Sequence, residues 1–288
     1  MWSEVFQSFL SIAFELTLLF IGISFLINLL QGLIPYDKME RLMEKSHPLV
    51  RAAVALAFAF ITPFCSCSTI PVVVNLLNKK VRFGIVMIFL FASPVLDPTI
   101  ITLMTAVLGF KVAIAYTVIT SVLSVVIGFA LEKFGFEDQI KKVVVSGYQA
   151  PGKTLDVKAA FAETIQLMKT VYPYLLIGAG IGAFIHGAVP TDWITTYMGG
   201  DKWWLVPLAA IIGIPLYIRL STMIPISQIM IAKGMALGPV MALMISSAGA
   251  SLPELTLLHS IFKKKLVFAF VGSVFTMSTI SGFLFYMI

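Results

Sequence analysis

Long apolar runs without charged residues are the feature that most restricts what this chain can fold into. Residues 52–78, 112–131 and 266–288 carry no formal charge, and residues 5–34 carry only Glu15. Each run is near or above the roughly 20 residues that a helix needs to cross a bilayer. The first run lacks a basic leading segment and is too long for a signal-peptide core, so we expect it to be retained. The sequence therefore predicts an all-α polytopic membrane protein.

The balance of residue types supports this class and excludes others. Of the 288 residues, 59% are hydrophobic and only 12% are charged, whereas about a quarter are charged in a soluble domain. The net charge of +6 comes largely from lysines and arginines in short loops between apolar runs. That pattern is typical of the cytoplasmic loops of membrane proteins and not of a nucleic-acid surface. We expect a multi-pass membrane protein in contact with the lipid bilayer and not with nucleic acid.

The chain also contains an internal repeat, which emerges when it is compared with itself at a shift of 154 or 155 residues. Most matching positions are Gly or Pro, the residues that control backbone shape. The pairs are Gly32 with Gly187, Pro35 with Pro190, Asp37 with Asp192, Pro71 with Pro225, Gly84 with Gly238, Pro98 with Pro253 and Gly128 with Gly282. We expect a first transmembrane repeat at 1–131, a cytoplasmic linker at 132–163 and a second transmembrane repeat at 164–288.

Each half divides into four apolar stretches, of which the second is a broken span and the third is interrupted near its centre. The stretches are 8–34, 49–78, 83–110 and 112–131 in the first half, and 168–189, 204–232, 234–260 and 266–287 in the second. Ser93–Pro98 interrupts the third stretch of the first half, and Ser251–Glu254 interrupts its counterpart. Each third stretch either crosses the membrane once with a break or turns back as a hairpin.

The basic residues favour the hairpin. If each third stretch crosses once, the lysines and arginines divide almost equally between the two sides. If each is a hairpin, the second half is inverted and most basic residues share one side. The residues left on the other side are Lys79, Lys80, Arg82, Lys111 and Lys202. Because cytoplasmic loops are enriched in Lys and Arg, we predict two inverted repeats with broken or re-entrant helices at the centre.

The break at Thr62–Pro71 carries the side chains best suited to bind a solute. Between two prolines that disfavour a regular helix lie Cys65, Ser66, Cys67, Ser68 and Thr69. In a regular helix the two thiols would point about 200° apart, but in an irregular turn they can converge on one soft, thiophilic species, a metalloid included. The alternative is a pair of buried cysteines that pack as small hydrophobes.

The second half has a cation where the first has thiols. Arg219 lies inside an apolar run, where a charge is costly and usually functional. Its candidate partners are Asp97 and Glu254, and we predict that the three charges serve gating or coupling. The alternative is a structural ion pair that holds the two halves together. The prolines predicted to mark structural breaks are Pro63, Pro71, Pro94, Pro98, Pro215, Pro225 and Pro253.

The string Thr62–Ser68, followed by Pro71, closely resembles the signature of the ArsP/YraQ-type permeases. Ala92-Ser93-Pro94 with Asp97-Pro98 is similar to that family's second signature, and Ala250–Glu254 is similar to its counterpart in the second half. The resemblance covers nearly the whole chain. It implies an inner-membrane permease, and characterised members export trivalent organoarsenicals through binding to thiols. This chain has only the two cysteines of the motif, which suits a two-coordinate species.

We therefore predict a permease that exports a small thiophilic or anionic solute, without a cofactor and without enzymatic activity. The sequence lacks a glycine-rich nucleotide loop, so energy is expected to come from an ion gradient or the solute's own gradient. Its 3 histidines are too few and too far apart for a metalloprotease. One alternative is a membrane thiol oxidoreductase using Cys65 and Cys67, although the usual redox spacing is Cys-x-x-Cys. Another is a non-transporting membrane subunit.

Overall fold

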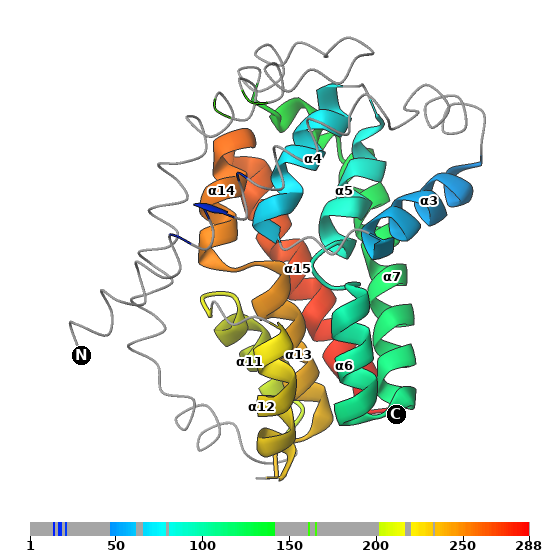
Figure 1. Ribbon diagram of the computed structural model, residues 1–288, viewed down its shortest axis with the longest axis vertical. Helices are drawn as coiled ribbons and strands as arrows, with labels where there is room; N and C mark the ends of the chain where they lie inside the picture. Colours follow the sequence, from blue (N-terminus) through cyan, green and yellow to red (C-terminus); the bar gives the residue numbers. More distant parts are fainter. Residues whose placement is uncertain are drawn as a thin grey trace, which may run out of the picture.

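Helices make up the fold throughout the part of the chain that the computed structural model describes (Figure 1). The described residues are 47–61, 66–78, 81–141, 202–216, 220–232 and 234–287, with the single positions 14, 17, 18, 21, 161 and 165. Within them there is no β-strand, and Ile140 and Phe262 form one isolated β-bridge. The all-α prediction is confirmed for these residues. Apart from position 161, the predicted linker beyond Lys141 lies outside them, as do all of the stretch 168–189 and most of the stretch 8–34.

Among the described residues, two helices are long and apolar enough to cross a membrane by themselves. They are α7 (Phe110–Lys133) and α15 (Lys264–Phe285). In Figure 1 both run nearly the full height of the molecule. We call the end where α7 finishes at Lys133 the upper end and the end where α7 begins at Phe110 the lower end, as the figure is oriented.

Helices α5 (Phe83–Ala92) and α6 (Pro98–Leu108) lie end to end along α7 (Figure 1). At the upper end, Arg82 precedes α5 and forms an ion pair with Glu132 of α7, with 2.9 Å between Nη2 and Oε1. At the lower end, α6 is joined to α7 through Gly109, which has a positive φ of 97°. The third stretch of the first half therefore runs once along α7 with a break in the middle. The predicted hairpin at this position is wrong, because a new helix starts at Pro98 in the same direction.

The third stretch of the second half has the same form. Helices α13 (Leu237–Gly249) and α14 (Leu252–Ile261) meet at a bend of only 43°, whereas a hairpin requires a reversal. Phe262 and Lys263 then lead into α15 at the upper end. There Lys263 N–H donates to the Gln139 carbonyl (2.8 Å), and Lys141 N–H donates to the Ile261 carbonyl (3.0 Å). Here too the hairpin prediction is wrong.

The reversals fall in the second stretches instead. Helix α3 (Pro48–Ile61) packs along α5, with Ala52 beside Ile85 and the rings of Phe58 and Phe89 5.1 Å apart. Helix α4 (Ser66–Asn78) begins beside the α5–α6 break and ends at the upper end, where Val81 N–H donates to the Leu76 carbonyl. Both helices therefore have their outer ends at the upper end.

Helices α11 (Leu205–Gly213) and α12 (Leu220–Ala232) mirror this arrangement from the lower end. Before α11, the Lys202 carbonyl accepts a hydrogen bond from the hydroxyl of Tyr286, just after α15. The end of α11 at Gly213 packs against Ser246 of α13. Helix α12 then returns, and its Gln228 Nε2 donates to the carbonyl of Val107 near the end of α6 (2.7 Å). The second stretches were predicted as broken spans, but their helices enter and leave at the same end.

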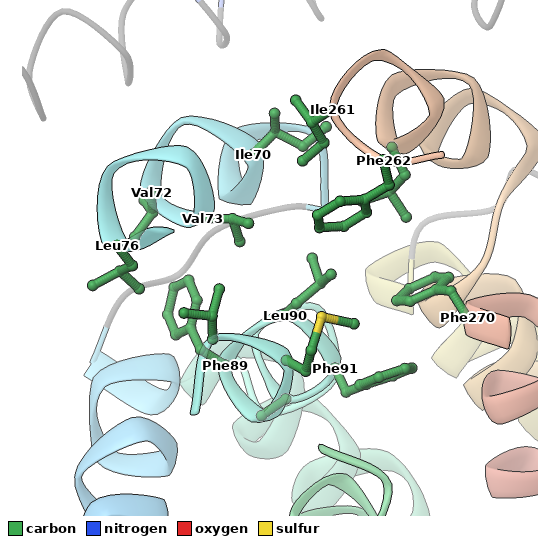
Figure 2. Close-up of a cluster of buried hydrophobic side chains, with 14 of the residues drawn as sticks. Ile70, Val72, Val73, Leu76, Phe89, Leu90, Phe91, Ile261, Phe262 and Phe270 are labelled. Carbon is green, nitrogen blue, oxygen red and sulfur yellow. The ribbon is translucent and has the colours of Figure 1, made fainter. Parts of the chain in front are cut away.

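Two buried apolar clusters hold these elements together, and both join the two halves of the chain. One combines α4 and α5 with α14 and α15. Figure 2 shows Ile70 beside Ile261, and the rings of Phe91 and Phe270 are stacked with centroids 4.7 Å apart. The other combines α6, α7, α11, α12 and α13.

Helix α7 has one face for lipid and one for protein. Ile114, Val118, Val122 and Val126, spaced by four residues, are all exposed. The positions Tyr116, Thr120, Ser124 and Gly128, also spaced by four, are all buried. Residues at this spacing share one side of a helix. The exposed β-branched stripe suits contact with acyl chains, while small side chains on the inner face let helices approach closely.

Helix backbones approach closely at two glycines in matching positions. A Cβ added to Gly128 would lie 2.9 Å from the carbonyl oxygen of Gly84, and one added to Gly282 would lie 2.9 Å from that of Gly238. Alanine at either site would push α7 from α5, or α15 from α13. Overpacking of this kind costs about 1–3 kcal/mol.

We therefore expect Gly128→Ala and Gly282→Ala each to lower the melting temperature of the detergent-solubilised protein. Gly272→Ala in α15 is the matched control, because nothing lies within 4 Å of its added Cβ. That variant should be neutral or slightly more stable, since alanine favours a helix by roughly 0.5–1 kcal/mol over glycine. Equal melting temperatures for all three variants would contradict the close packing.

Candidate functional site

The candidate site lies where four helices begin in the interior of the molecule. Helices α4, α6, α12 and α14 all start near the breaks at 93–97 and 250–251, which we call the central breaks. Leu96 of one break and Ala250 of the other belong to the same buried cluster. Val95 belongs to the cluster that contains Leu220 at the start of α12. The first amides of a helix have no intrahelical acceptor, so the region concentrates N–H groups that need other partners, together with positive helix ends.

The predicted thiol site falls at the start of α4. Ser66, Cys67 and Ser68 are the first three residues of this helix, while Pro63 and Cys65 lie outside the described residues. Pro71 was predicted to break the segment, but α4 continues through it, so that prediction is wrong. Because Pro71 has no N–H, it cannot bond to the carbonyl of Cys67 four residues earlier. Cys67 therefore offers both a thiol and a carbonyl that Pro71 leaves without its helical donor.

A buried hydrogen bond ties the start of α4 to one central break. Thr69 Oγ1 and Ser93 Oγ are 3.2 Å apart, and both residues are fully buried. Thr69 was predicted to contact solute. Ser93 was not among the predicted site residues, although it belongs to the Ser-Pro element that sequence reasoning had singled out. The bond fixes the helix that carries Cys67 against the end of α5.

Asp97 caps α6. Its Oδ1 accepts hydrogen bonds from Thr99 N–H (2.7 Å) and from the Thr99 hydroxyl (2.5 Å), and Pro98 follows as the first helical residue. Proline is well suited to this position because its missing N–H would have no intrahelical partner there. Pro98 is thus the first residue of α6, and Pro94 lies in the turn before it.

Glu254 occupies the corresponding position in the second half. It lies in the first turn of α14, one residue after Pro253, and is 0% exposed. Helix α14 packs against α4, the helix that carries Cys67. A buried ionised carboxylate is costly unless its charge is compensated. Glu254 and Asp97 therefore have different surroundings, since Asp97 is partly exposed.

The remaining predicted residues lie around the α11–α12 reversal. Pro215 is in the turn after α11. Pro225 lies inside α12, which continues through it, so the predicted break there is wrong. Arg219 lies outside the described residues, and so does its predicted pairing with Asp97 or Glu254. Among the described residues, no group of three or more His, Cys, Asp or Glu is placed to hold a metal ion.

The helices are apolar, and several of them begin in the interior of the molecule. The protein therefore belongs to the class of membrane proteins that are built around broken helices. A family model described as a predicted permease matches residues 1–287. The chain therefore belongs to the ArsP family of predicted permeases, which are transporters and not enzymes. This confirms the resemblance inferred from the Thr62–Ser68 string.

Three relatives agree with this membership. UPF0718 protein MJ0584 of Methanocaldococcus jannaschii is 23% identical over 283 residues, covering 76% of this chain and 77% of that protein. UPF0718 protein YraQ of Escherichia coli is 26% identical over 246 residues, covering 83% and 68%. A Streptococcus mutans protein, whose name assigns it to a two-component membrane permease complex as a subunit, is 22% identical over 224 residues, covering 74% and 72%. No solved structure matches the chain.

The capping role of Asp97 can be separated from a role for its charge. Asp97→Ala should lower stability by about 1 kcal/mol through loss of the cap, whereas Asp97→Asn should stay near wild type because asparagine caps equally well. Thermal unfolding in detergent measures both. Transport lost in Asp97→Asn at unchanged stability would assign a function to the charge, and an unaltered Asp97→Ala protein would contradict the cap.

Proposed function

We propose that this permease exports a small thiophilic solute across the cell membrane, through a site formed at the central breaks by Cys65 and Cys67. The observation that carries the proposal is the position of α4, the helix that contains Cys67, because near its start the buried Thr69 is hydrogen-bonded to Ser93 of a central break. Irregular backbone is tolerated at membrane depth only where protein or a water-filled cavity surrounds it. Substrate sites of secondary transporters are commonly built from such interrupted helices.

An inverted repeat is part of the proposal. Along the chain, α5 and α6 run from the upper to the lower end and α7 returns, whereas α13 and α14 run upward and α15 returns downward. The matching contacts of Gly84 with Gly128 and of Gly238 with Gly282 support a shared unit. Re-entry of α3–α4 from the upper end and of α11–α12 from the lower end supports opposite orientations. Two such units can open alternately to the two sides of the membrane.

The basic residues support an upper end that faces the cytoplasm. The described lysines and arginines gather there, and only Lys111 and Lys202 lie at the lower end. Those at the upper end are Arg51, Arg82, Lys133, Lys141, Lys263, Lys264 and Lys265. Arg82 was predicted on the opposite side from Lys133, but its ion pair with Glu132 brings the two together, so that prediction is wrong. Cytoplasmic loops carry such an excess of Lys and Arg.

The chemistry of the site suits a trivalent organoarsenical with two exchangeable positions. Two thiolates are soft ligands that prefer a soft centre, and each would displace one oxygen ligand from arsenic. Ser66, Ser68 and Thr69 are the hydroxyl-bearing neighbours of the pair in the sequence. Asp97, Arg219 and Glu254 supply charge for coupling or gating.

A partner subunit is a second candidate feature. One relative bears a name that places it in a two-component permease complex. A second chain would then cover part of the exposed apolar surface of the bundle.

Sidedness can be tested by labelling with a membrane-impermeant maleimide in a variant whose Cys65 and Cys67 are both serine. Added Arg82→Cys or Lys265→Cys should react only when the cytoplasmic face is accessible, because both positions lie at the upper end. Lys111→Cys should react in intact cells and serves as the matched control. A label on position 82 from outside would contradict the assignment.

Transport can be tested by uptake of a trivalent methylarsenical into inside-out vesicles. We expect saturable uptake by the wild type and at least about a tenfold loss in Cys65→Ser and in Cys67→Ser, because serine removes a soft ligand. The pentavalent compound, which thiolates do not ligate, is the matched control and should not be transported. Uptake unaffected in both variants would remove the thiol site, and thiol redox cycling without solute movement would favour the oxidoreductase alternative.

A further inference from the structure

Among the described residues, the buried methionines gather in one of the two apolar clusters. The cluster that joins α6, α7, α11, α12 and α13 contains seven methionines among its 21 buried members. The cluster that joins α4 and α5 with α14 and α15 contains one, Met87, among 23, and has five phenylalanines instead. Methionine used only to fill irregular gaps in a core would be expected in both clusters alike. The difference therefore calls for a reason specific to the first of them.

Five of the seven thioethers lie on three helices that pack together. Helix α12 contacts both α6 and α13 (Figure 1). Each of the five side chains is at most 1% exposed, and we call them the methionine group. They are Met104 of α6, Met223 and Met230 of α12, and Met241 and Met244 of α13.

The methionines of α12 and α13 are placed to face the same region. Met223 and Met230 are seven residues apart and so share one face of α12. On α13, Ala242 packs against α15 and Ser246 packs against α11. Because a helix turns by about 100° per residue, Met241 and Met244 lie on the opposite side of α13, away from both of these helices.

The five residues also lie at similar heights in the molecule. A tight turn with Gly234 at a φ of 91° joins α12 to α13, and there Met235 N–H donates to the Met230 carbonyl (3.0 Å). Counted from this turn, Met241 and Met244 fall between the levels of Met230 and Met223.

Met104 falls within the same interval. It lies three residues before Val107, whose carbonyl accepts the hydrogen bond from Gln228 of α12. Helices α6 and α12 both run toward the lower end, so Met104 is level with a residue between Met223 and Met230. Met104 is also the one fully buried residue of α6.

Thioether sulfur is a neutral, polarisable and soft ligand. Together with thiolate it selects soft metal ions such as Cu(I), whereas carboxylates and carbonyls suit hard cations. A neutral ligand set leaves the charge of the bound ion uncompensated, and that favours a single charge over two in a buried position. The methionine group therefore suits a soft monovalent cation.

Two oxygen atoms of the same region can share the charge of such an ion. Pro225 has no N–H, so it leaves the carbonyl of Ser221, two residues before Met223, without its helical donor. Tyr116 of α7 belongs to the same cluster and is fully buried, and its hydroxyl has no hydrogen-bond partner among the described residues. A buried hydroxyl without a partner is costly, so its oxygen favours a ligand nearby.

We propose that the methionine group binds a soft monovalent cation of the Cu(I) and Ag(I) class. The site is separate from Cys65 and Cys67 and does not depend on the export proposed above. Its ligands come from three helices, two of which, α12 and α13, form the hairpin that turns at Gly234. The permease then recognises soft species at two places, one with thiols and one with thioethers.

The first test measures binding of Ag(I) to the whole protein in detergent, in a Cys65→Ser/Cys67→Ser background that removes the thiols. Ag(I) has the charge and softness of Cu(I) and is stable in air. Native mass spectrometry should show one silver ion per chain. Met241→Leu/Met244→Leu should weaken binding at least about tenfold, because leucine removes two soft ligands. Met87→Leu, equally buried in the other cluster, is the matched control and should bind silver unchanged.

The second test asks whether the ligands converge from different helices. Met104→Leu and Met223→Leu, made singly, should each weaken silver binding, although they lie on different helices from Met241 and Met244. X-ray absorption at the silver edge should show sulfur neighbours. Leucine has nearly the volume of methionine, so these variants should fold, and their melting temperatures check this.

Each contrary result is decisive. Absence of bound silver in the Cys65→Ser/Cys67→Ser protein would overturn the proposal and leave the methionines as packing. Silver binding unchanged in Met241→Leu/Met244→Leu, or nitrogen and oxygen neighbours in place of sulfur, would also overturn it. If the double variant does not fold, Met104→Leu and Met223→Leu decide the question. Uptake of the trivalent methylarsenical tests the thiol site separately, so failure of either proposal leaves the other standing.

Discussion

The need to satisfy backbone hydrogen bonds away from water is the constraint on which the rest of this structure depends. A regular helix meets it internally, so α7 and α15 can present exposed apolar faces to lipid along their length. The interrupted helices cannot, and their breaks at 93–97 and 250–251 lie inside buried clusters. Among the described residues, the backbone groups of these breaks, which lack regular helical hydrogen bonds, are therefore surrounded by protein.

The breaks use different devices to start their helices. Asp97 provides a side-chain cap and Pro98 the first helical residue. Pro253 lies in the first turn of α14 beside the buried Glu254. In α4 and α12 a proline sits inside the helix without ending it, because it deprives only one carbonyl near the helix start of its usual donor. These choices place the hydroxyls of Thr69 and Ser93 and the carboxyl groups of Asp97 and Glu254 near the central breaks.

Several features were predictable from residues alone. The uncharged runs gave the membrane class, because no packing arrangement can hide so much apolar surface in a chain of this size. The recurrence of Gly84, Gly128, Gly238 and Gly282 identified positions where helices approach closely, since only a residue without Cβ tolerates a backbone oxygen at such a distance. The Thr62–Ser68 string indicated the permease family that the family model shows.

The direction of each segment could not be derived in this way. A proline or polar break has the same local signature whether the chain continues or turns back, because both interrupt the same hydrogen bonds. Long-range contacts decided it: Arg82 with Glu132 and Ile140 with Phe262 show that the third stretches continue, and Gln228 with Val107 shows that α12 turns back. The sequence by itself determined a membrane-embedded helical permease with interrupted helices. Only tertiary packing decided which interruptions reverse the chain, because that depends on partners 50 or more residues away in the sequence.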